Sequence, residues 1–560
     1  MPSPPSSNKN VEALFQQALR YHQAGNLEAA QPLYMRVLTA NPHHANALAN
    51  LSTLYSQRGD IESCAHWIER SIAVNPHQAG AYFNYGNALT ILKRYDEALA
   101  AYDKALTLQP RSAIFHSNRG ITLYFLKRYD EALAAYEQAL RLEPNLAMAF
   151  INRGNTRKRI GLIEEALADY EHAIHLTPDD GSIYNNRADL LNRFRRYDEA
   201  LAATEQAIAV GTITALTYNT RGLALAGLWR FEEALASYAR AAELDPDFAS
   251  APWNASLIHL TFGRFEEGYR LYEWRWKTEL QKDTLRTFTQ PLWLGETPLA
   301  GKAILIYIEQ GLGDFIQYSR YFPLLEAMGA HVLVETPLPL IDLLRESLAT
   351  PRITFLAGGD FLPAFDLQCP LMSLPLAFQT TLATIPNSVP YLQINAGKKR
   401  RWQEMLGSKS SPRIGLVWSG GATHTNDHNR SIPLALLAPL LALPYEFHAL
   451  QKEVRDSDAA SLGPIHMHAT ELHDFTDTAA LLAHMDLVIT VDTSTAHLAG
   501  ALGKPVWILL AHTPDFRWML ERTDSLWYPS ARLFRQSAIG DWPNAIAQVI
   551  QALTTLFPCE

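Results

Sequence analysis

One short segment combines a predicted strand end with residues suited to binding an anion. In DLVITVDTSTAHLAGALGKPVWILL (residues 486–510) an apolar run leads directly into four polar residues, where a helix is expected to begin. These residues are Asp492, Thr493, Ser494 and Thr495. The free N–H groups and the positive dipole end of such a helix favour a diphosphate, and the hydroxyls and His497 add donors. Alternatively, Asp492 or Thr493 only caps the helix and His497 is a surface or core histidine.

A second segment with chemical potential is the glycine-rich loop EQGLGD. It lies between a predicted strand, Ala303–Ile308, and a predicted helix, Phe315–Met328. The candidate residues of this loop are Gln310, Gly311, Gly313 and Asp314. Asp314 has two interpretations from the residues alone, an N-cap of the helix or a base in a cleft. The loop is not a Walker A motif, because no Gly-Lys-Ser/Thr follows, and ATP hydrolysis is disfavoured.

The third candidate segment is the polar loop WSGGATHTNDHNRSIP (residues 418–433). It holds His424, Asp427, His428 and Arg430. Histidines this close suggest zinc, but no further ligands follow at a recognisable spacing. We therefore expect these side chains to contact a donor or an acceptor and predict no metal and no cofactor.

The elements that must position these loops alternate between strands and helices. Ala303–Ile308, the helix Phe315–Met328 and the strand His331–Glu335 form a βαβ unit. A second unit starts with RIGLVWS at Arg413 and continues through the following predicted elements. They are the strand Glu446–Leu450, the helix Asp477–His484, the strand Asp486–Val491, the helix Thr495–Leu502 and the strand Pro505–Leu510. This pattern predicts two Rossmann-like α/β lobes with a cleft between them.

The first half of the chain repeats with a period of 34 residues from Val11. Its eighth place holds only small residues, and its twenty-fourth place is mostly aromatic. The eighth-place residues are Ala18, Ser52, Gly86, Gly120, Gly154, Ala188, Gly222 and Ser256; the aromatic ones are Tyr34, Tyr102, Tyr136, Tyr170, Tyr238 and Tyr272. This pattern resembles the tetratricopeptide repeat (TPR), with seven full blocks and a partial eighth ending near Trp276. The resemblance implies an α-solenoid of TPR helix pairs with a concave groove lined by the first helices.

An asparagine recurs two places before the small packing residue. The series is Asn50, Asn84, Asn118, Asn152 and Asn186, it is interrupted by Thr220, and it resumes at Asn254. These residues lie about 200° round the helix from the packing residue, so they should face the groove. An asparagine amide both donates and accepts hydrogen bonds, which suits the backbone of an extended peptide. A similar ladder lines the TPR groove of the eukaryotic O-GlcNAc transferases; the alternative is that the asparagines are merely solvated.

Three motifs of the second half, in the same order, resemble heptosyltransferase-type (family 9) glycosyltransferases. They are LIYIEQGLGDFIQYSR, WSGGATHTNDHNRSIP and VDTSTAHLAGALGKPVW, within residues 291–543. The resemblance implies a two-lobed GT-B glycosyltransferase in which Asp314 is the general base and the turn at Asp492 binds the donor diphosphate. Arg430 matches a phosphate-contacting basic residue, although it replaces the family's lysine and the spacing differs. Lys452 is a further candidate for the diphosphate.

The composition excludes some classes of function. The net charge is −9, the three cysteines are far apart, and no apolar run is long enough to span a membrane. We expect a cytoplasmic protein without a leader and without a nucleic-acid partner. The predicted segments are a disordered N-terminus (1–10), a TPR superhelix (11–280), an acceptor-side lobe (290–395), a linker (396–412) and a nucleotide-sugar-side lobe (413–555).

The resemblance leaves three functions open. The first is a hexosyl- or heptosyltransferase-like enzyme that is metal-independent and inverting, with a nucleotide-diphospho sugar as donor and a protein held by the TPR groove as acceptor. The second keeps the enzyme but takes a lipopolysaccharide or other glycan as acceptor, with the repeats recruiting an assembly partner. The third is a non-catalytic TPR scaffold with a degenerate transferase domain.

Overall fold

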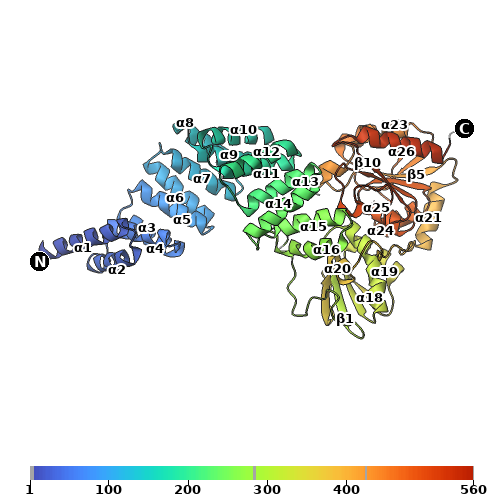
Figure 1. Ribbon diagram of the computed structural model, residues 1–560, viewed down its shortest axis with the longest axis horizontal. Coiled ribbons are helices and arrows are strands. Elements are labelled where there is room, and N and C mark those ends of the chain that lie inside the picture. The colour runs from blue at the N-terminus through green and yellow to red at the C-terminus, as the bar shows by residue number, and fades with distance from the viewer. Residues whose placement is uncertain (1–4, 280, 282–284, 423–425, 559–560) are drawn as a thin grey trace. The chain divides into compact units, whose positions relative to one another are not determined.

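The computed structural model describes residues 5–279, 281, 285–422 and 426–558 (Figure 1). The chain divides into two compact units that meet between Leu228 and Trp229. The predicted fold class is confirmed, because helix pairs fill the first half and parallel α/β sheets fill the second. Among the described residues, no helix has both the length and the apolar character that crossing a bilayer requires.

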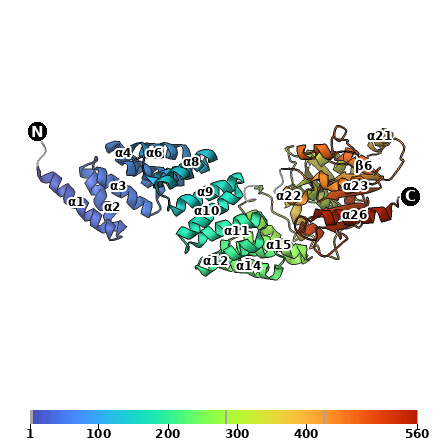
Figure 2. The same cartoon turned by 90° about the horizontal axis from the view of Figure 1, so that it is seen from above.

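The first unit is a row of antiparallel helix pairs, and both views show successive pairs in chain order (Figures 1 and 2). Its helices are α1 (Pro5–Gln23), α2 (Leu27–Ala40), α3 (Ala45–Gln57), α4 (Ile61–Val74), α5 (Ala79–Ile91), α6 (Tyr95–Leu108), α7 (Ala113–Phe125), α8 (Tyr129–Leu142), α9 (Ala147–Ile160), α10 (Ile163–Leu176), α11 (Gly181–Arg193), α12 (Tyr197–Ala209) and α13 (Ala215–Gly227). Helix α1 begins at Pro5, inside the segment that was expected to be disordered.

The small and aromatic columns of the repeat pack directly against each other. A Cβ atom added to Gly120 would lie 2.6 Å from the ring of Tyr136, and one added to Gly86 would lie 2.8 Å from the ring of Tyr102. Both tyrosines are almost fully buried. The glycines therefore let the two helices of a repeat approach until the ring of the second contacts the backbone of the first.

The second unit begins with the last helices of the repeat array. These are α14 (Phe231–Leu244), α15 (Ser250–Thr261), α16 (Phe265–Tyr272) and the 3₁₀ helix η1 (Glu273–Lys277). The eighth pair is thus present but its second helix is short. Helix α16 buries Phe265, Tyr269 and Tyr272 in the same hydrophobic core as the first sheet.

Two parallel sheets form the rest of the second unit. The first has the order β3-β2-β1-β4, and the second has the order β10-β9-β8-β5-β6-β7. The strands are β1 (Ala303–Tyr307), β2 (His331–Thr336), β3 (Ile353–Ala357), β4 (Leu367–Pro370), β5 (Arg413–Val417), β6 (Glu446–Ala449), β7 (Ile465–His466), β8 (Leu487–Val491), β9 (Val506–Leu510) and β10 (Ala531–Arg535). In chain order the second sheet is 3-2-1-4-5-6, the order of a dinucleotide-binding Rossmann fold.

Strands β8 and β9 are buried along their whole length because helices cover both faces of the second sheet (Figure 1). Leu487 and Ile489 of β8 pack in the core that includes α26 (Trp542–Leu556). Val488, which points the other way, packs in the core that includes α24 (Phe475–Leu482) and α25 (Ser494–Ala501). The alternation along β8 therefore anchors α25 on one face of the sheet.

Two segments differ from the sequence-based expectation. The helix expected at Phe315–Met328 is broken into α17 (Leu312–Tyr318), η2 (Ser319–Tyr321) and α18 (Phe322–Ala327), because a proline follows Phe322 and cannot continue an α-helical hydrogen-bond ladder. The expected linker 396–412 is mostly helix α21 (Ala396–Leu406). Asn395 caps that helix at Lys398 N, 2.9 Å away, and Trp402 anchors it in the core.

Replacing Gly120 with alanine should destabilise the first unit by about 1–3 kcal/mol, because the new Cβ overlaps the ring of Tyr136. The midpoint of urea unfolding, followed by circular dichroism, measures the change. Gly80→Ala is the matched control. Gly80 has open space around its Cβ position, so alanine there should be neutral or stabilise by up to about 1 kcal/mol. Equal midpoints for the two variants would contradict the packing argument.

Candidate active site

The candidate site lies where the chain order reverses in the second sheet. Strands β5 and β8 are neighbours, and their continuing chains leave in opposite directions, so a crevice opens beyond their carboxyl ends. The loop after β5 contains Ser419, Gly420 and Gly421, and the loop after β8 contains Asp492 and Thr493. Ligands of open α/β sheets bind at this point.

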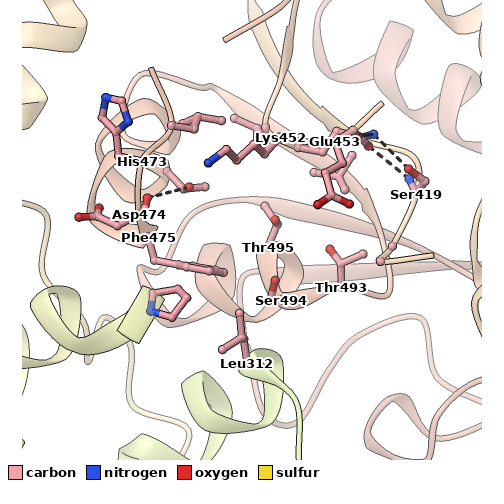
Figure 3. A pocket seen from close by; sticks show the side chains of 18 residues that line it. Leu312, Ser419, Lys452, Glu453, His473, Asp474, Phe475, Thr493, Ser494 and Thr495 are labelled. Carbon is pink, nitrogen blue, oxygen red and sulfur yellow. Dashed lines mark hydrogen bonds between the residues drawn. The ribbon is translucent and has the colours of Figure 1, made fainter. Parts of the chain in front are cut away.

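Two adjoining cavities open at the crevice, which we call cavity A (460 Å³) and cavity B (630 Å³). They share Leu312, Gly420, Gly421, Thr493 and Ser494. Cavity A is lined mostly by the second lobe, and Figure 3 shows Lys452 reaching into it with Thr493, Ser494 and Thr495 on another side and Leu312 of the first lobe nearby. Cavity B lies between loop 310–314 of the first lobe and the second lobe.

Most of the predicted site residues of the second half meet in these cavities. Cavity A takes Lys452 and Thr495, in addition to the shared Thr493 and Ser494. The predicted residues that line cavity B are Gln310, Gly311, Gly313, Asp314, Arg430, Asp492, Thr493, Ser494 and His497. The glycine loop and the turn at Asp492, almost 180 residues apart in sequence, thus face the same space.

Helix α25 directs its first turn at the crevice. Thr493 occupies the N-cap position with extended backbone (φ −141°, ψ 173°), but its side chain makes no capping hydrogen bond. Its hydroxyl lies 3.3 Å from that of Thr490 instead. The first backbone N–H groups of the helix are therefore not occupied by a side-chain cap from Thr493, which keeps this end suited to an anion.

Arg430 reaches the same crevice from the short helix α22 (Asp427–Arg430). Its Nη1 donates to the backbone oxygen of Asp492 over 3.2 Å. Its buried Nε lies 3.9 Å from Asp427 Oδ1 and has no hydrogen-bond partner among the described residues. A Cβ on Gly420 would lie 2.6 Å from the guanidinium, so a glycine is needed for this close approach. The arginine is thereby held with unused donor capacity at the edge of cavity B.

The other predicted members of this loop do not line the cavities. The carboxylate of Asp427 accepts a hydrogen bond from Ser431 Oγ (2.7 Å) and forms an ion pair with Arg455. It is buried as a structural group, which corrects the prediction of a ligand contact. His428 is exposed and lines neither cavity. His424 lies outside the described residues.

Asp314 is engaged at both carboxylate oxygens. Oδ2 accepts from Gly311 N (3.0 Å), so Asp314 helps to cap helix α17 from its N3 position, while Gly311, and not Asp314 as predicted, is the N-cap residue. Oδ1 lies 2.5 Å from Nη2 of Arg517, which belongs to the opposite lobe. The two interpretations of Asp314 are therefore compatible, since one oxygen caps the helix and the other faces cavity B.

Arg517 and Asp515 were missed by the sequence analysis. Arg517 is buried in η7 (Phe516–Trp518), and its Nη1 lies 2.7 Å from Asp515 Oδ1. Although burial opposes the charge, the carboxylates of Asp314 and Asp515 hold the pKa of Arg517 well above its usual value. The available signal was topological: the loop after β9 begins at the same sheet edge as the loops after β5 and β8.

His497 lies in the contact between the two lobes. Its Nδ1 lies 3.0 Å from the hydroxyl of Tyr528, and its ring stacks on Trp518 with centroids 5.2 Å apart. Burial lowers the pKa of His497 well below its usual value, and Arg517 adds to this effect, so the ring is neutral. A Cβ on Gly313 would lie 2.8 Å from His497, and this glycine lets α17 pack against α25.

The predicted asparagine ladder is uneven. Asn84 is exposed, whereas Asn50, Asn118, Asn152 and Asn186 are half-buried. Asn118 donates from Nδ2 to Asn87 Oδ1 over 2.8 Å. Asn254 is buried, which corrects its predicted place in an open groove, because its helix α15 packs against η1 and η7.

Asp492 carries a perturbed carboxyl group in the lining of cavity B. Burial raises the pKa of Asp492 to about 6, and the carboxylate of Asp515 adds to this effect, while Arg517 and Arg430 oppose it. The group is therefore partly protonated near pH 6. Its charge at the proposed phosphate position depends on pH.

Comparisons with known proteins agree with both halves of this architecture. Residues 77–143, 151–212 and 215–248 match tetratricopeptide repeat families, and residues 7–105 match subunit 3 of the anaphase-promoting complex (cyclosome). Residues 469–537 match glycosyltransferase family 9 (heptosyltransferase). This last segment contains Asp492, His497, Asp515 and Arg517.

One curated relative and several solved structures are similar to the chain. Protein FlbA of Caulobacter vibrioides is 27% identical over 350 residues, which are 55% of this chain and 55% of that protein. The chain thus matches about half the length of this relative. A tetratricopeptide repeat protein from Parabacteroides merdae is 21% identical (42% of this chain, 94% of that one, TM-score 0.38). TTC0263 from Thermus thermophilus is 25% identical (32% and 98%, TM-score 0.28).

The raised pKa of Asp492 predicts that Asp492→Asn changes the pH dependence of stability. Because the pKa in the folded state (about 6) is above the unfolded value near 4, the contribution of Asp492 to wild-type stability should fall as the pH rises from about 4 to about 6. The asparagine variant should lack this loss, which amounts to at most about 3 kcal/mol for two pKa units. Thermal unfolding of both proteins between pH 4 and 7 measures the difference. Parallel curves would show that Asp492 titrates normally.

Proposed function

We propose that this TPR-repeat protein, with its glycosyltransferase family 9 segment, transfers a sugar from a nucleotide-diphospho sugar to a protein. The observation that carries the proposal is the arrangement at cavity B, where Asp314 of one lobe faces Arg430 and the N-terminus of α25 of the other. A candidate base and a candidate anion site thus border one space of 630 Å³. Glycosyl transfer with a diphosphate leaving group needs both.

The donor is proposed to lie across both cavities. Its nucleoside would occupy cavity A, and its diphosphate would lie at the shared boundary formed by Thr493 and Ser494. The N–H groups of the first turn of α25 and the guanidinium of Arg430, whose Nε makes no hydrogen bond, would stabilise the negative charge that develops on the leaving diphosphate. Lys452 adds positive charge from the cavity A side.

The proposed reaction is a direct displacement at the anomeric carbon. The acceptor oxygen forms a bond to that carbon as the bond to the diphosphate oxygen breaks, and the nucleoside diphosphate leaves with the electron pair. Asp314 Oδ1 takes the proton of the acceptor. Because the acceptor attacks from the face opposite the leaving diphosphate, the configuration of the anomeric carbon inverts. Protein cations supply the charge in this scheme, and it requires no metal ion.

Arg517 bears on this scheme because it neutralises Asp314 before the reaction. The 2.5 Å ion pair has to loosen for Oδ1 to accept a proton. When it does, the guanidinium stays in cavity B beside Arg430, where the leaving diphosphate gains charge. The same arginine would then restrain the base in the free enzyme and stabilise charge in the transition state.

The TPR array is the proposed site for the protein acceptor. Asn84 offers an exposed amide, and the half-buried Asn50, Asn152 and Asn186 recur at the same place of their repeats. Amides at a regular spacing suit the backbone of an extended segment, whatever its sequence. A glycan acceptor would make no use of this row, and this difference separates the two acceptor classes experimentally.

A donor screen tests the activity itself. Purified protein is incubated with UDP-, GDP- and ADP-sugars, with CMP-sugars as the monophosphate comparison, and release of the nucleotide is measured. We expect slow hydrolysis of one diphospho donor. If no donor is hydrolysed and no nucleotide binds, the chain is a scaffold and the proposal fails.

Asp314→Asn should lower the rate of sugar transfer by about 10²- to 10⁴-fold, because the amide cannot take the acceptor proton. The dissociation constant of the donor nucleotide should stay the same or fall, since Arg517 loses its interlobe carboxylate and keeps its charge. Turnover and calorimetric binding measure the two effects. Asp342→Asn, at an exposed position of the same lobe, is the control. Undiminished turnover would remove Asp314 as the base.

Replacing Asn84 and Asn152 with alanine should raise the KM for a protein acceptor and leave the KM for a small-sugar acceptor unchanged. Each lost hydrogen bond should cost roughly a factor of 2 to 10. Gln206→Ala, which removes an exposed amide from the second helix of a repeat, is the control. If both acceptors respond equally, or neither does, the groove does not hold the acceptor.

A further inference from the structure

Arg275 is a fully buried cation at the end of the repeat array. It lies in η1, directly after the last TPR helix, and its guanidinium has no solvent-exposed surface. It donates to carboxylates, a hydroxyl and a backbone oxygen. The distances are 2.7 and 3.0 Å to the oxygens of Glu309, 2.6 Å to Glu273 Oε1, 2.8 Å to Ser373 Oγ and 3.2 Å to Tyr272 O.

Two of these partners, Glu309 and Ser373, belong to the switch point of the first sheet. Strands β1 and β4 are neighbours there; Glu309 follows β1, and Ser373 ends η4 (Leu371–Ser373), which follows β4. Glu309 also accepts from Met372 N over 2.8 Å. Arg275 thus fills the crevice of the first lobe that corresponds to the ligand crevice of the second lobe.

The same contacts reach the loop that carries the proposed base. Glu309 and Gln310 directly precede Gly311, and Gln310 Nε2 donates to the hydroxyl of Tyr272 over 2.8 Å. Gly311 N in turn donates to Asp314 Oδ2. A chain of hydrogen bonds and covalent links therefore runs from the last repeat to the carboxylate of Asp314.

The cost of burying the charges of Arg275 and Glu309 favours one fixed arrangement of this ion pair. Burial raises the pKa of Glu309, and Arg275 opposes this effect through its charge and its hydrogen bonds. Removing one member of such a buried pair leaves an uncompensated charge, which is strongly destabilising. The backbone of residues 309–311 is thus tied to a group that cannot move without losing several charged hydrogen bonds.

We propose that Arg275 is a positioning residue that fixes loop 309–314, and with it Asp314, on the terminal segment of the TPR array. The last repeat is then part of the acceptor side of the transferase. The mechanical part of this inference, that Arg275 holds loop 309–314 in place, stands on the contacts alone. Its effect on sugar transfer rests on the proposed function.

Hydrogen exchange of the full-length protein tests the mechanical part. In Arg275→Met, amides of the peptide 308–318 should exchange at least about tenfold faster, while the peptide 487–501 of the second lobe should keep its wild-type rate. Arg270→Met is the matched control, because it removes a surface arginine–glutamate pair on α16, with Glu267, and should change neither peptide. Unchanged exchange of 308–318, or equally fast exchange everywhere, would overturn the proposal.

Two milder variants keep the test decisive if Arg275→Met does not fold. Arg275→Lys keeps the charge but loses the fork that serves several partners, and Glu309→Gln keeps the shape but loses the charge. Both should accelerate exchange of 308–318 by a smaller factor than the methionine variant. If both variants fold and neither accelerates the exchange of 308–318, loop 309–314 is held by other contacts and Arg275 is not its positioning residue.

Kinetics test the catalytic consequence. Arg275→Lys should lower kcat by roughly 10²-fold through misplacement of Asp314, with the donor KM within about twofold of wild type. In an Asp314→Asn background the same substitution should have almost no further effect on kcat, because both changes act through one carboxylate. Additive losses would contradict positioning through Asp314. A wild-type protein without transfer activity would refute the proposed function, while the exchange result would still decide the role of Arg275.

Discussion

The two lobes of the second unit depend on one interaction, the ion pair between Arg517 and Asp314. A buried guanidinium is costly unless carboxylates compensate it, and Arg517 obtains one carboxylate from its own loop, Asp515, and one from the opposite lobe. This requirement brings loop 310–314 to the second sheet, where Gly313 allows α17 to pack on α25. The two lobes are thus held together by the compensation of the Arg517 charge as well as by apolar contact.

The same interaction shapes the electrostatics of the cleft. His497 is neutral because burial and the nearby guanidinium both disfavour its protonation, so it cannot compete with the arginines for an anion. Asp492 is held partly protonated near pH 6 because its own burial and Asp515 outweigh the two arginines. Positive charge in cavity B therefore comes from Arg430 and Arg517, which both line it, while Lys452 lines cavity A.

The sequence predicted what local patterns encode. The Gly120–Tyr136 contact appears as two columns of the repeat, and the buried strand β8 as an apolar run before Asp492. Asp515, Arg517 and Arg275 could not be found in this way. The two arginines also pair with carboxylates distant in sequence, Asp314 and Glu309, and these roles arise only when loops meet at a sheet edge. Asp427 was misjudged for the complementary reason: its partner Arg455 lies 28 residues away, and the ion pair removes it from the cavities.

The end of the repeat array follows from the same physical constraint as its interior. Each helix pair buries its apolar face against a neighbour, so a solenoid needs a final element with a polar outer face. One side of helix α16 is polar and exposed, but the other is apolar: Phe265, Tyr269 and Tyr272 belong to the core of the first lobe, and Arg275 continues this contact into the crevice of the first sheet. The two-lobed α/β module therefore covers the end of the repeat array. A truncation between the two sequence-defined halves would expose an apolar face on one side and a buried carboxylate, Glu309, on the other, so the last repeat belongs structurally to the module that follows it.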